Sequence, residues 1–188
     1  LRRILLSSIP GTAIIGVKIT DVLHEFQTIN GVVEDTSEII LNMKEVRIRT
    51  SDKKLTKVQL QFKGPGVWTA KDIQDAAPTL EVMDPSHHIA TLADDAEFDV
   101  ELRLGKGKGY VPADEQVITD FPVGMLPIDS IYTPIMNVVY AIEPYRVGQR
   151  TDYERLILDV KTDGTISAQE AVHASAKIMN DHIKYFIN

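Results

Sequence analysis

The sequence predicts an α+β fold of two subdomains, in which an inserted, mostly-β subdomain interrupts a subdomain of helices and antiparallel sheet. In residues 57–62 and 98–104, apolar and polar side chains alternate, which indicates antiparallel strands with one buried and one wet face. Near both ends of the chain, apolar residues recur at helical spacing instead. We therefore expect residues 1–10 and 138–188 to form one subdomain, with residues 11–137 inserted between them.

The composition is that of a soluble globular protein. The 188 residues are 44% hydrophobic and 25% charged, which is enough for one or two domains with a sizeable core. No apolar run approaches the ~20 residues of a membrane span, and no signal peptide opens the chain. The absence of cysteine excludes disulfides, thiolate metal sites and a cysteine nucleophile, and it fits a reducing compartment.

The net charge of −7 is spread unevenly. Residues 11–137 hold 12 Lys and Arg against 20 Asp and Glu, whereas residues 1–10 carry two arginines and no acid. Dense phosphate binding needs a basic surface. We therefore expect no direct nucleic-acid binding.

The pattern of residues 1–10 indicates the C-terminal end of a helix. Their apolar residues fall on one stripe, and Pro10 followed by Gly11 is a stop signal. No capping residue precedes the stripe, and Arg2 and Arg3 would lie in the first turn, where the helix dipole disfavours positive charge. We therefore expect the natural helix to begin upstream and this chain to be a fragment. The two arginines fit either a solvated helix face or a contact with a partner.

The inserted segment begins with a strand, a loop and a helix. Thr12–Thr20 alternates as a strand, and Asp21–Val33 is loop-like. Asp35, with Glu38 three residues later, predicts a helix N-cap, and the helix would run to about Lys44.

Short strands and turns follow. A Gly-Pro-Gly run predicts a turn at Lys63–Val67. The breakers in Gly105–Gly109 and Pro112–Pro134 predict a long, ordered loop. Three more strands are expected at Val46–Arg49, Leu80–Met83 and Ile89–Ala93.

A second pair of strands precedes the last helix. Val138–Glu143 and Glu154–Thr162 are predicted strands joined by Tyr145–Asp152, and Asp163-Gly164 turns the chain.

The last helix should begin with a capping box of Ser167 and Glu170 and run to about Ile187. Its apolar set is wider than a helix needs to cover one sheet. A second copy of the chain is the simplest source of further cover, so we expect a symmetric dimer. The apolar positions are Ala171, Val172, Ala174, Ala176, Ile178, Met179, Ile183, Phe186 and Ile187.

No catalytic constellation stands out. His87 and His88 are adjacent, so on a strand they point to opposite faces and rarely share a metal ion. Gly105–Gly109 lacks the order of a phosphate loop and no helix follows it, which favours a basic strand end or turn. His24 and Glu25 have no accompanying nucleophile or ligand. We expect no catalytic residue, cofactor or metal.

Six segments occur in an order that resembles a known family. Together they are similar to the N-terminal assembly region of bacterial-type DNA-directed RNA polymerase alpha subunits, across nearly all 188 residues. The segments are LRRILLSSIPG, DVLHEF, GVVEDTSEIILNMK, GKGKGYVPA, RVGQRTDYERL and TDGTISAQEA.

The resemblance implies a scaffold without chemistry of its own, within a nucleotidyltransferase complex. Residues 1–10 and 138–188 would form the dimerisation subdomain, and the dimer would gather a beta-type and a beta-prime-type large subunit. The residues expected at the dimer interface, chosen for the excess apolar surface of the helices, are Leu5, Ala171, Ala174, Ile178, Ile183 and Phe186.

The resemblance also implies contacts with the large subunits. Arg3 is the position most tied to the beta-type subunit. Further candidates for that partner are His24, Glu25, Phe26, Val33, Glu34, Asp35 and Thr36. Within Arg146–Asp152, the candidates for either large subunit are Gln149, Arg150 and Asp152.

The family pattern contains strands upstream and a C-terminal DNA- and activator-binding domain that this sequence lacks, so promoter binding is not assigned. The expected location is the bacterial cytoplasm or nucleoid, or a plastid. A second interpretation is a small-molecule or nucleotide-binding domain or enzyme that uses the 105–110 loop and His87-His88.

Overall fold

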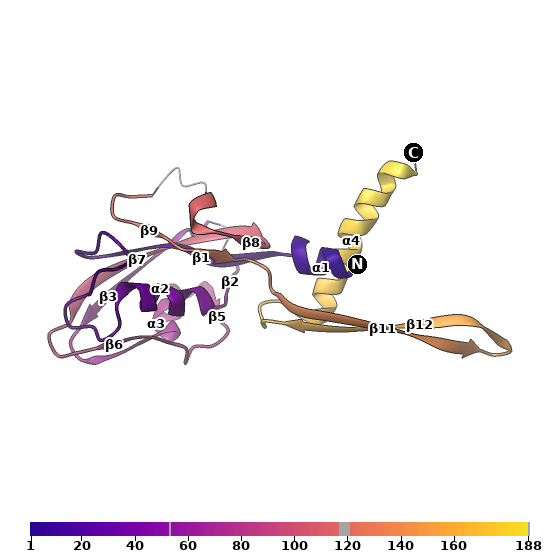
Figure 1. The fold of residues 1–188 in the computed structure, drawn as a ribbon, viewed down its shortest axis with the longest axis horizontal. Coiled ribbons are helices and arrows are strands. Elements are labelled where there is room, and N and C mark those ends of the chain that lie inside the picture. Colours follow the sequence, from indigo (N-terminus) through magenta and orange to yellow (C-terminus); the bar gives the residue numbers. More distant parts are fainter. Residues whose placement is uncertain (53, 117–120, 188) are drawn as a thin grey trace. The chain divides into compact units, whose positions relative to one another are not determined.

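The computed structural model describes residues 1–52, 54–116 and 121–187 (Figure 1). The chain divides into two compact units, Leu1–Ile9 with Thr133–Asn188, and Pro10–Tyr132. The boundaries predicted from the sequence lie after residues 10 and 137, compared with 9 and 132 in the structure. The helices and antiparallel sheets confirm the predicted α+β class.

The main sheet of the larger unit is antiparallel throughout, as the alternation predicted. Its strands are β1 (Pro10–Ile19), β2 (Ile48–Thr50), β3 (Lys57–Lys63), β5 (Leu80–Val82), β7 (Glu97–Lys108) and β9 (Leu126–Pro127). The order is β3-β7-β1-β2-β5, and β9 also pairs with β1. In the central pair, Ile14 lies opposite Leu104 and Ile19 opposite Val100, with a bulge between Ile14 and Gly16.

One face of this sheet is covered by α2 (Thr36–Glu45), α3 (Ala70–Ala76) and the pair β4 (Gly66–Thr69) and β6 (His88–Leu92) (Figure 1). Trp68, Ile73 and Leu102 are fully buried in the core between these layers. Asp35 caps α2 as predicted, since its carboxylate accepts a hydrogen bond of 2.8 Å from the Glu38 amide.

The sequence did not predict α3 or β4. The helix has only seven residues, too few for helical periodicity to show, and it begins with a capping box between Thr69 and Asp72. The predicted turn at Lys63–Val67 ends earlier than expected, because β4 already begins at Gly66 and pairs with β6.

The predicted loop of Gly105–Gly109 and Pro112–Pro134 contains more regular structure than expected. Residues 105–108 continue β7, and the later part contains a 3₁₀ helix, η1 (Ala113–Glu115), and short strands. Part of this prediction, residues 117–120, lies outside the described residues. Besides β9, the short strands in and beside the predicted loop are β8 (Tyr110–Val111) and β10 (Ser130–Ile131), which pair with each other.

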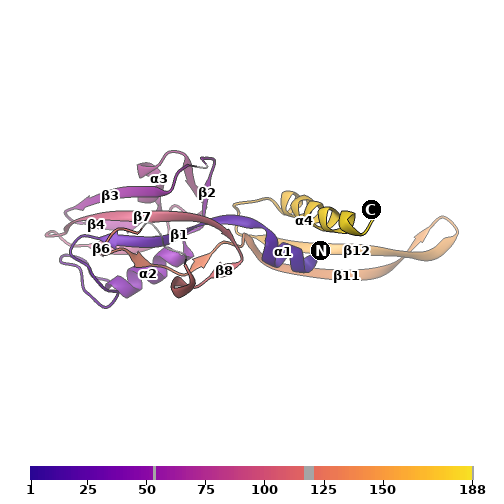
Figure 2. The ribbon, with the colours of Figure 1, turned by 90° about the horizontal axis from the view of Figure 1, so that it is seen from above.

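The smaller unit is a long hairpin with two helices on one face (Figures 1 and 2). Its elements are α1 (Arg2–Ser8), β11 (Ile135–Val147), β12 (Arg150–Thr162), α4 (Ala168–Ile183) and the 3₁₀ helix η2 (Lys184–Phe186). The capping box of Ser167 and Glu170 is confirmed. The predicted last helix extended to Ile187, but the α-helix ends four residues earlier and η2 follows it.

The hairpin strands are longer than predicted. Tyr145–Asp152 was expected to connect them, but Tyr145 pairs with Tyr153 and only Gly148 and Gln149 form the turn. Gly148 has a φ of 60°, which suits the first central position of a type II′ turn. A two-residue turn accommodates the glycine, so the strands continue on either side of it through most of the predicted connection.

Candidate protein-interaction surfaces

Arg2 and Arg3 have different surroundings on α1. The Arg2 Nε donates a hydrogen bond of 2.9 Å to the Val138 carbonyl in β11. The Arg3 side chain is exposed and forms no hydrogen bond or ion pair with any described residue. Neither predicted interpretation, a solvated helix face or a partner contact, describes Arg2, because its side chain bonds within the unit. Arg3 keeps an open guanidinium that fits both interpretations.

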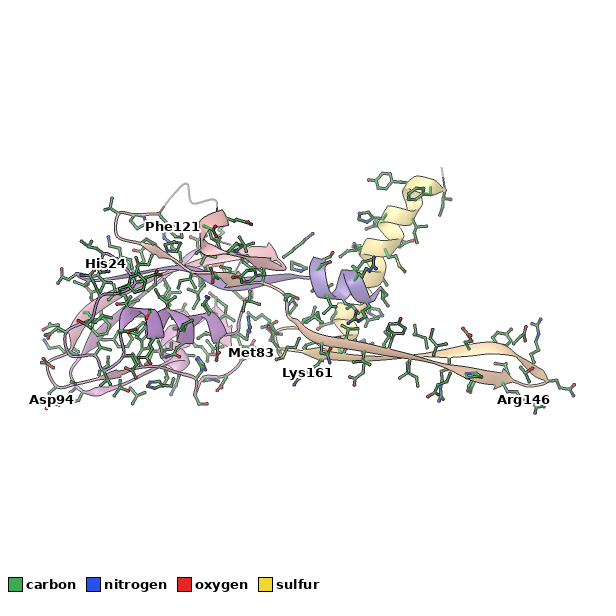
Figure 3. All side chains as sticks on the ribbon, in the orientation of Figure 1. His24, Met83, Asp94, Phe121, Arg146 and Lys161 are labelled. Carbon is green, nitrogen blue, oxygen red and sulfur yellow. The ribbon has the colours of Figure 1, made fainter. Side chains whose placement is uncertain are left out.

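The loop after β1 exposes two large apolar side chains. Leu23 is 71% and Phe26 is 79% exposed. The Gln27 side-chain carbonyl accepts hydrogen bonds from the Leu23 and His24 amides, which fixes the loop locally. His24, labelled in Figure 3, and Glu25 are also exposed. The loop was predicted from the sequence, but nothing in the sequence pattern indicates that Leu23 is exposed.

Three consecutive predicted contact residues are used inside the fold. Glu34 accepts hydrogen bonds from the Thr91 amide at 2.6 Å and the Thr91 hydroxyl at 3.0 Å, and it pairs with the His88 Nε2 at 2.8 Å. Asp35 is exposed and caps α2. Thr36 is fully buried, and its hydroxyl donates to the Gln27 carbonyl at 2.7 Å.

The prediction that Thr36 touches a partner is therefore wrong in this fold, because no part of its surface is accessible. The Glu34 side chain is 15% exposed. Its partial burial raises the pKa, but the bonds from Thr91 and His88 outweigh burial and hold the pKa of Glu34 below its ordinary value. The neighbouring Val33 is 74% exposed and remains a candidate contact.

The hairpin tip carries Gln149, Arg150 and Asp152 on its exposed surface. The Arg150 guanidinium lies 5.8 Å from the ring centroid of Tyr153, and its Nε lies 3.8 Å from the Asp152 carboxylate. Figure 3 labels Arg146 at this end of the hairpin. These groups present mixed charge and aromatic surface to solvent.

Part of the hairpin leaves an apolar face uncovered. Residues opposite each other in an antiparallel pair share a face, and Val138 opposite Val160 packs against α1 and α4. Two positions further along, the same face carries Tyr140, and then Ile142 opposite Leu156. These three side chains are 56–57% exposed. A contiguous exposed apolar surface is typical of an interaction site.

The end of the chain adds to this exposed apolar surface. Ile183 is 46% and Phe186 is 89% exposed, whereas Ala174 and Ile178 are half-buried. Leu5 and Ala171 are fully buried in the unit's own core beside Ile9 and Ile135. The structure thus corrects the predicted dimer interface, because Leu5 and Ala171 have no accessible surface for a second copy.

The two motifs of the small-molecule interpretation have structural explanations. In the GKGKG stretch, a Cβ at Gly107 would lie 2.7 Å from the ring of Tyr132, so the glycine makes room for that ring. His87 and His88 diverge as predicted: the His87 Nε2 bonds the Asn42 carbonyl, and His88 pairs with Glu34.

Among the described residues, no group of three or more His, Cys, Asp or Glu could hold a metal ion. In the same part of the chain, the helices are too short or too polar to cross a membrane.

Comparison with known proteins gives one family. A model described as the RNA polymerase Rpb3/RpoA insert domain matches residues 17–133. The chain is 51% identical over 187 residues to the DNA-directed RNA polymerase subunit alpha of Salinibacter ruber, and 50% identical over 186 residues to that of Chloroherpeton thalassium. The subunit of Alkaliphilus oremlandii is 51% identical over 187 residues. The alignments cover 99–100% of this chain and 57–59% of the relatives' length.

Proposed function

The chain belongs to the family of bacterial DNA-directed RNA polymerase alpha subunits, and we propose that it is a non-catalytic scaffold of that enzyme. In this proposal the chain dimerises and brings a beta-type and a beta-prime-type subunit together for transcription. The nucleotidyl-transfer chemistry belongs to the large subunits, and the scaffold acts in the bacterial cytoplasm.

The observation that carries the proposal is the uncovered apolar surface of the smaller unit. Tyr140, Ile142 and Leu156 lie on the hairpin face whose Val138 packs against residues of α1 and α4, yet these three side chains are exposed. Burial of each large apolar side chain contributes roughly 1.5–3 kcal/mol. A second copy supplies an equally apolar surface, which supports a symmetric dimer built on this face, with Ala174, Ile178, Ile183 and Phe186 contributing from α4 and the turn after it.

Contacts with the large subunits are proposed on the exposed groups. Arg3 is available to a beta-type subunit because its guanidinium has no described partner. Phe26 and Val33 offer apolar surface to the same subunit, and Leu23 extends it. His24, Glu25 and Asp35 flank this surface with polar groups. Gln149, Arg150 and Asp152 at the hairpin tip are proposed to meet either large subunit.

Charge supports protein rather than nucleic-acid partners for the larger unit. Residues 11–137 carry eight more acidic than basic residues, which opposes binding to a polyphosphate backbone. The competing small-molecule interpretation has no support, because Gly105 and Gly107 lie close to the Tyr132 side chain and the two histidines point to different partners.

The test is co-purification with each large subunit separately, followed by size-exclusion chromatography. The proposal expects a dimer that co-elutes with the beta-type subunit and then recruits the beta-prime-type subunit. A monomer that co-elutes with neither, or one that nucleotide stabilises against heat, would contradict it.

A further inference from the structure

Glu34 holds the segment before α2 against β6. We propose that Glu34, Thr91 and His88 form a clamp that orders residues 31–36, so that Glu34 acts in partner binding by positioning Val33 rather than by touching the partner. The inference rests on the proposed scaffold function and assigns Glu34, His88 and Thr91 the role of positioning residues.

The backbone of the segment adds to the edge of β6. The Val33 amide donates to the Thr91 carbonyl at 3.1 Å, and the Ala93 amide donates to the Gly31 carbonyl at 2.8 Å. Val32 forms a bridge with Leu92 between these two bonds. If the pairing continued, a backbone carbonyl would accept the next hydrogen bond, from the Thr91 amide. The Glu34 carboxylate accepts that hydrogen bond instead. A side chain thus replaces a backbone carbonyl and completes the pairing.

Glu34 and its neighbour Val33 differ in how far their side chains are buried. In an extended segment, successive side chains point to opposite sides. Glu34 is turned inward and is 15% exposed, while Val33 is turned outward and is 74% exposed. A partner would therefore meet mainly the valine, and the carboxylate offers it little surface.

The far end of the segment is tied to the loop that carries Phe26. The Thr36 amide and hydroxyl both donate to the Gln27 carbonyl, and the Gln27 side chain accepts from the His24 amide at 3.1 Å. The clamp on β6 is thereby connected, through consecutive hydrogen bonds and the short backbone between them, to the 23–27 loop. Opening the clamp should loosen both exposed surfaces.

The test compares matched variants in the complete chain. Glu34→Ala removes the clamp, and Glu81→Ala removes a carboxylate of the same type that pairs with Arg49 on β2, outside this region. Val33→Ala trims the proposed contact and leaves the clamp intact. Two readouts are taken: hydrogen exchange of the Val33 and Thr91 amides in the free chain, and capture of the purified beta-type subunit.

We expect Glu34→Ala to accelerate exchange of both amides roughly ten- to hundredfold, since hydrogen bonds to a charged group are among the stronger ones, and to leave the β1 and β7 amides unchanged. Capture should weaken about tenfold. Val33→Ala should weaken capture with unchanged exchange, and Glu81→Ala should change neither. Unchanged exchange in Glu34→Ala, or fast exchange with normal capture, would overturn the proposal.

His88 provides a rescue experiment and a milder variant if Glu34→Ala does not fold. Glutamine can donate a hydrogen bond to Glu34 as the imidazole does, so His88→Gln should retain more capture than His88→Ala. Equal loss in the two variants would contradict positioning and assign His88 a direct contact. If the unaltered chain fails to capture the subunit, the proposed function fails, whereas the exchange data still decide whether the clamp orders the segment.

Discussion

Arg2 and Arg3 are adjacent on α1, yet only Arg2 is bound into the smaller unit, through its Nε to the Val138 carbonyl at 2.9 Å. Adjacent helical positions project ~100° apart, so one guanidinium reaches the hairpin while the other is left in solvent. The pair therefore allows a structural arginine to be compared with a proposed contact arginine one residue away.

We predict that Arg3→Ala leaves the free energy of unfolding within about 0.5 kcal/mol of the original, as for other exposed positions. Capture of the beta-type subunit should weaken by ~2–5 kcal/mol, or roughly 30- to several-thousand-fold, because the partner group is left buried and unpaired. Arg3→Lys should rescue only partly. Arg2→Ala is the control: it should lower stability by about 1 kcal/mol. Normal capture by folded Arg3→Ala would contradict the assignment.

Substitutions in the smaller unit should separate interface from core. Phe186→Asp and Ile183→Asp place a charge on exposed surface and should give folded monomers, measured by light scattering and circular dichroism. Ala171→Asp places the same charge in a fully buried position and should unfold the unit. A dimer of unchanged mass in both exposed variants would exclude this end of the chain from the interface.

Acid should weaken the link between α2 and the segment around β10. The Lys44 Nζ and the Ala113 amide both donate to Asp129, and these bonds hold the pKa of Asp129 below its ordinary value. Because the folded-state pKa is lowered, the ionised carboxylate stabilises the fold at pH values above the ordinary pKa of aspartate. This stabilisation is lost as the pH falls from about 4 through the folded-state pKa. Asp129→Asn should therefore lose stability at neutral pH and show a shallower decline in acid. Parallel denaturation curves between pH 6 and 3 would argue against this linkage.

The glycines of the GKGKG stretch should be structural. In Gly107→Ala the new methyl group would overlap the Tyr132 ring, and stability should fall by roughly 1–3 kcal/mol. Gly66→Ala is the matched control, because its Cβ would meet open space. Lys106→Ala and Lys108→Ala should change stability by less than about 0.5 kcal/mol. Denaturant unfolding measures the stability of all four variants. If nucleotide stabilised the original chain but not the two lysine variants, a phosphate-binding role for this stretch would be supported instead.

Features that depend on neighbouring residues were readable from the sequence. The Asp35 cap, the Ser167–Glu170 capping box and the Asp163-Gly164 turn are set by local hydrogen bonds and backbone preferences, and each occurs where predicted. The alternation in residues 57–62 and 98–104 likewise required antiparallel strands. The order of six motifs was sufficient for the family, because such a match accumulates over the whole chain.

Only the tertiary structure decided which predicted site residues are exposed and which are buried within the fold. Thr91 lies 57 residues from Glu34, and no local pattern shows that its amide would turn that carboxylate inward while Val33 stays exposed. The same holds for Leu5 and Ala171, whose apolar character suits a core or an interface equally well. Periodicity indicates that a face is apolar; burial depends on what the folded chain places against it, and that is fixed by contacts between distant segments.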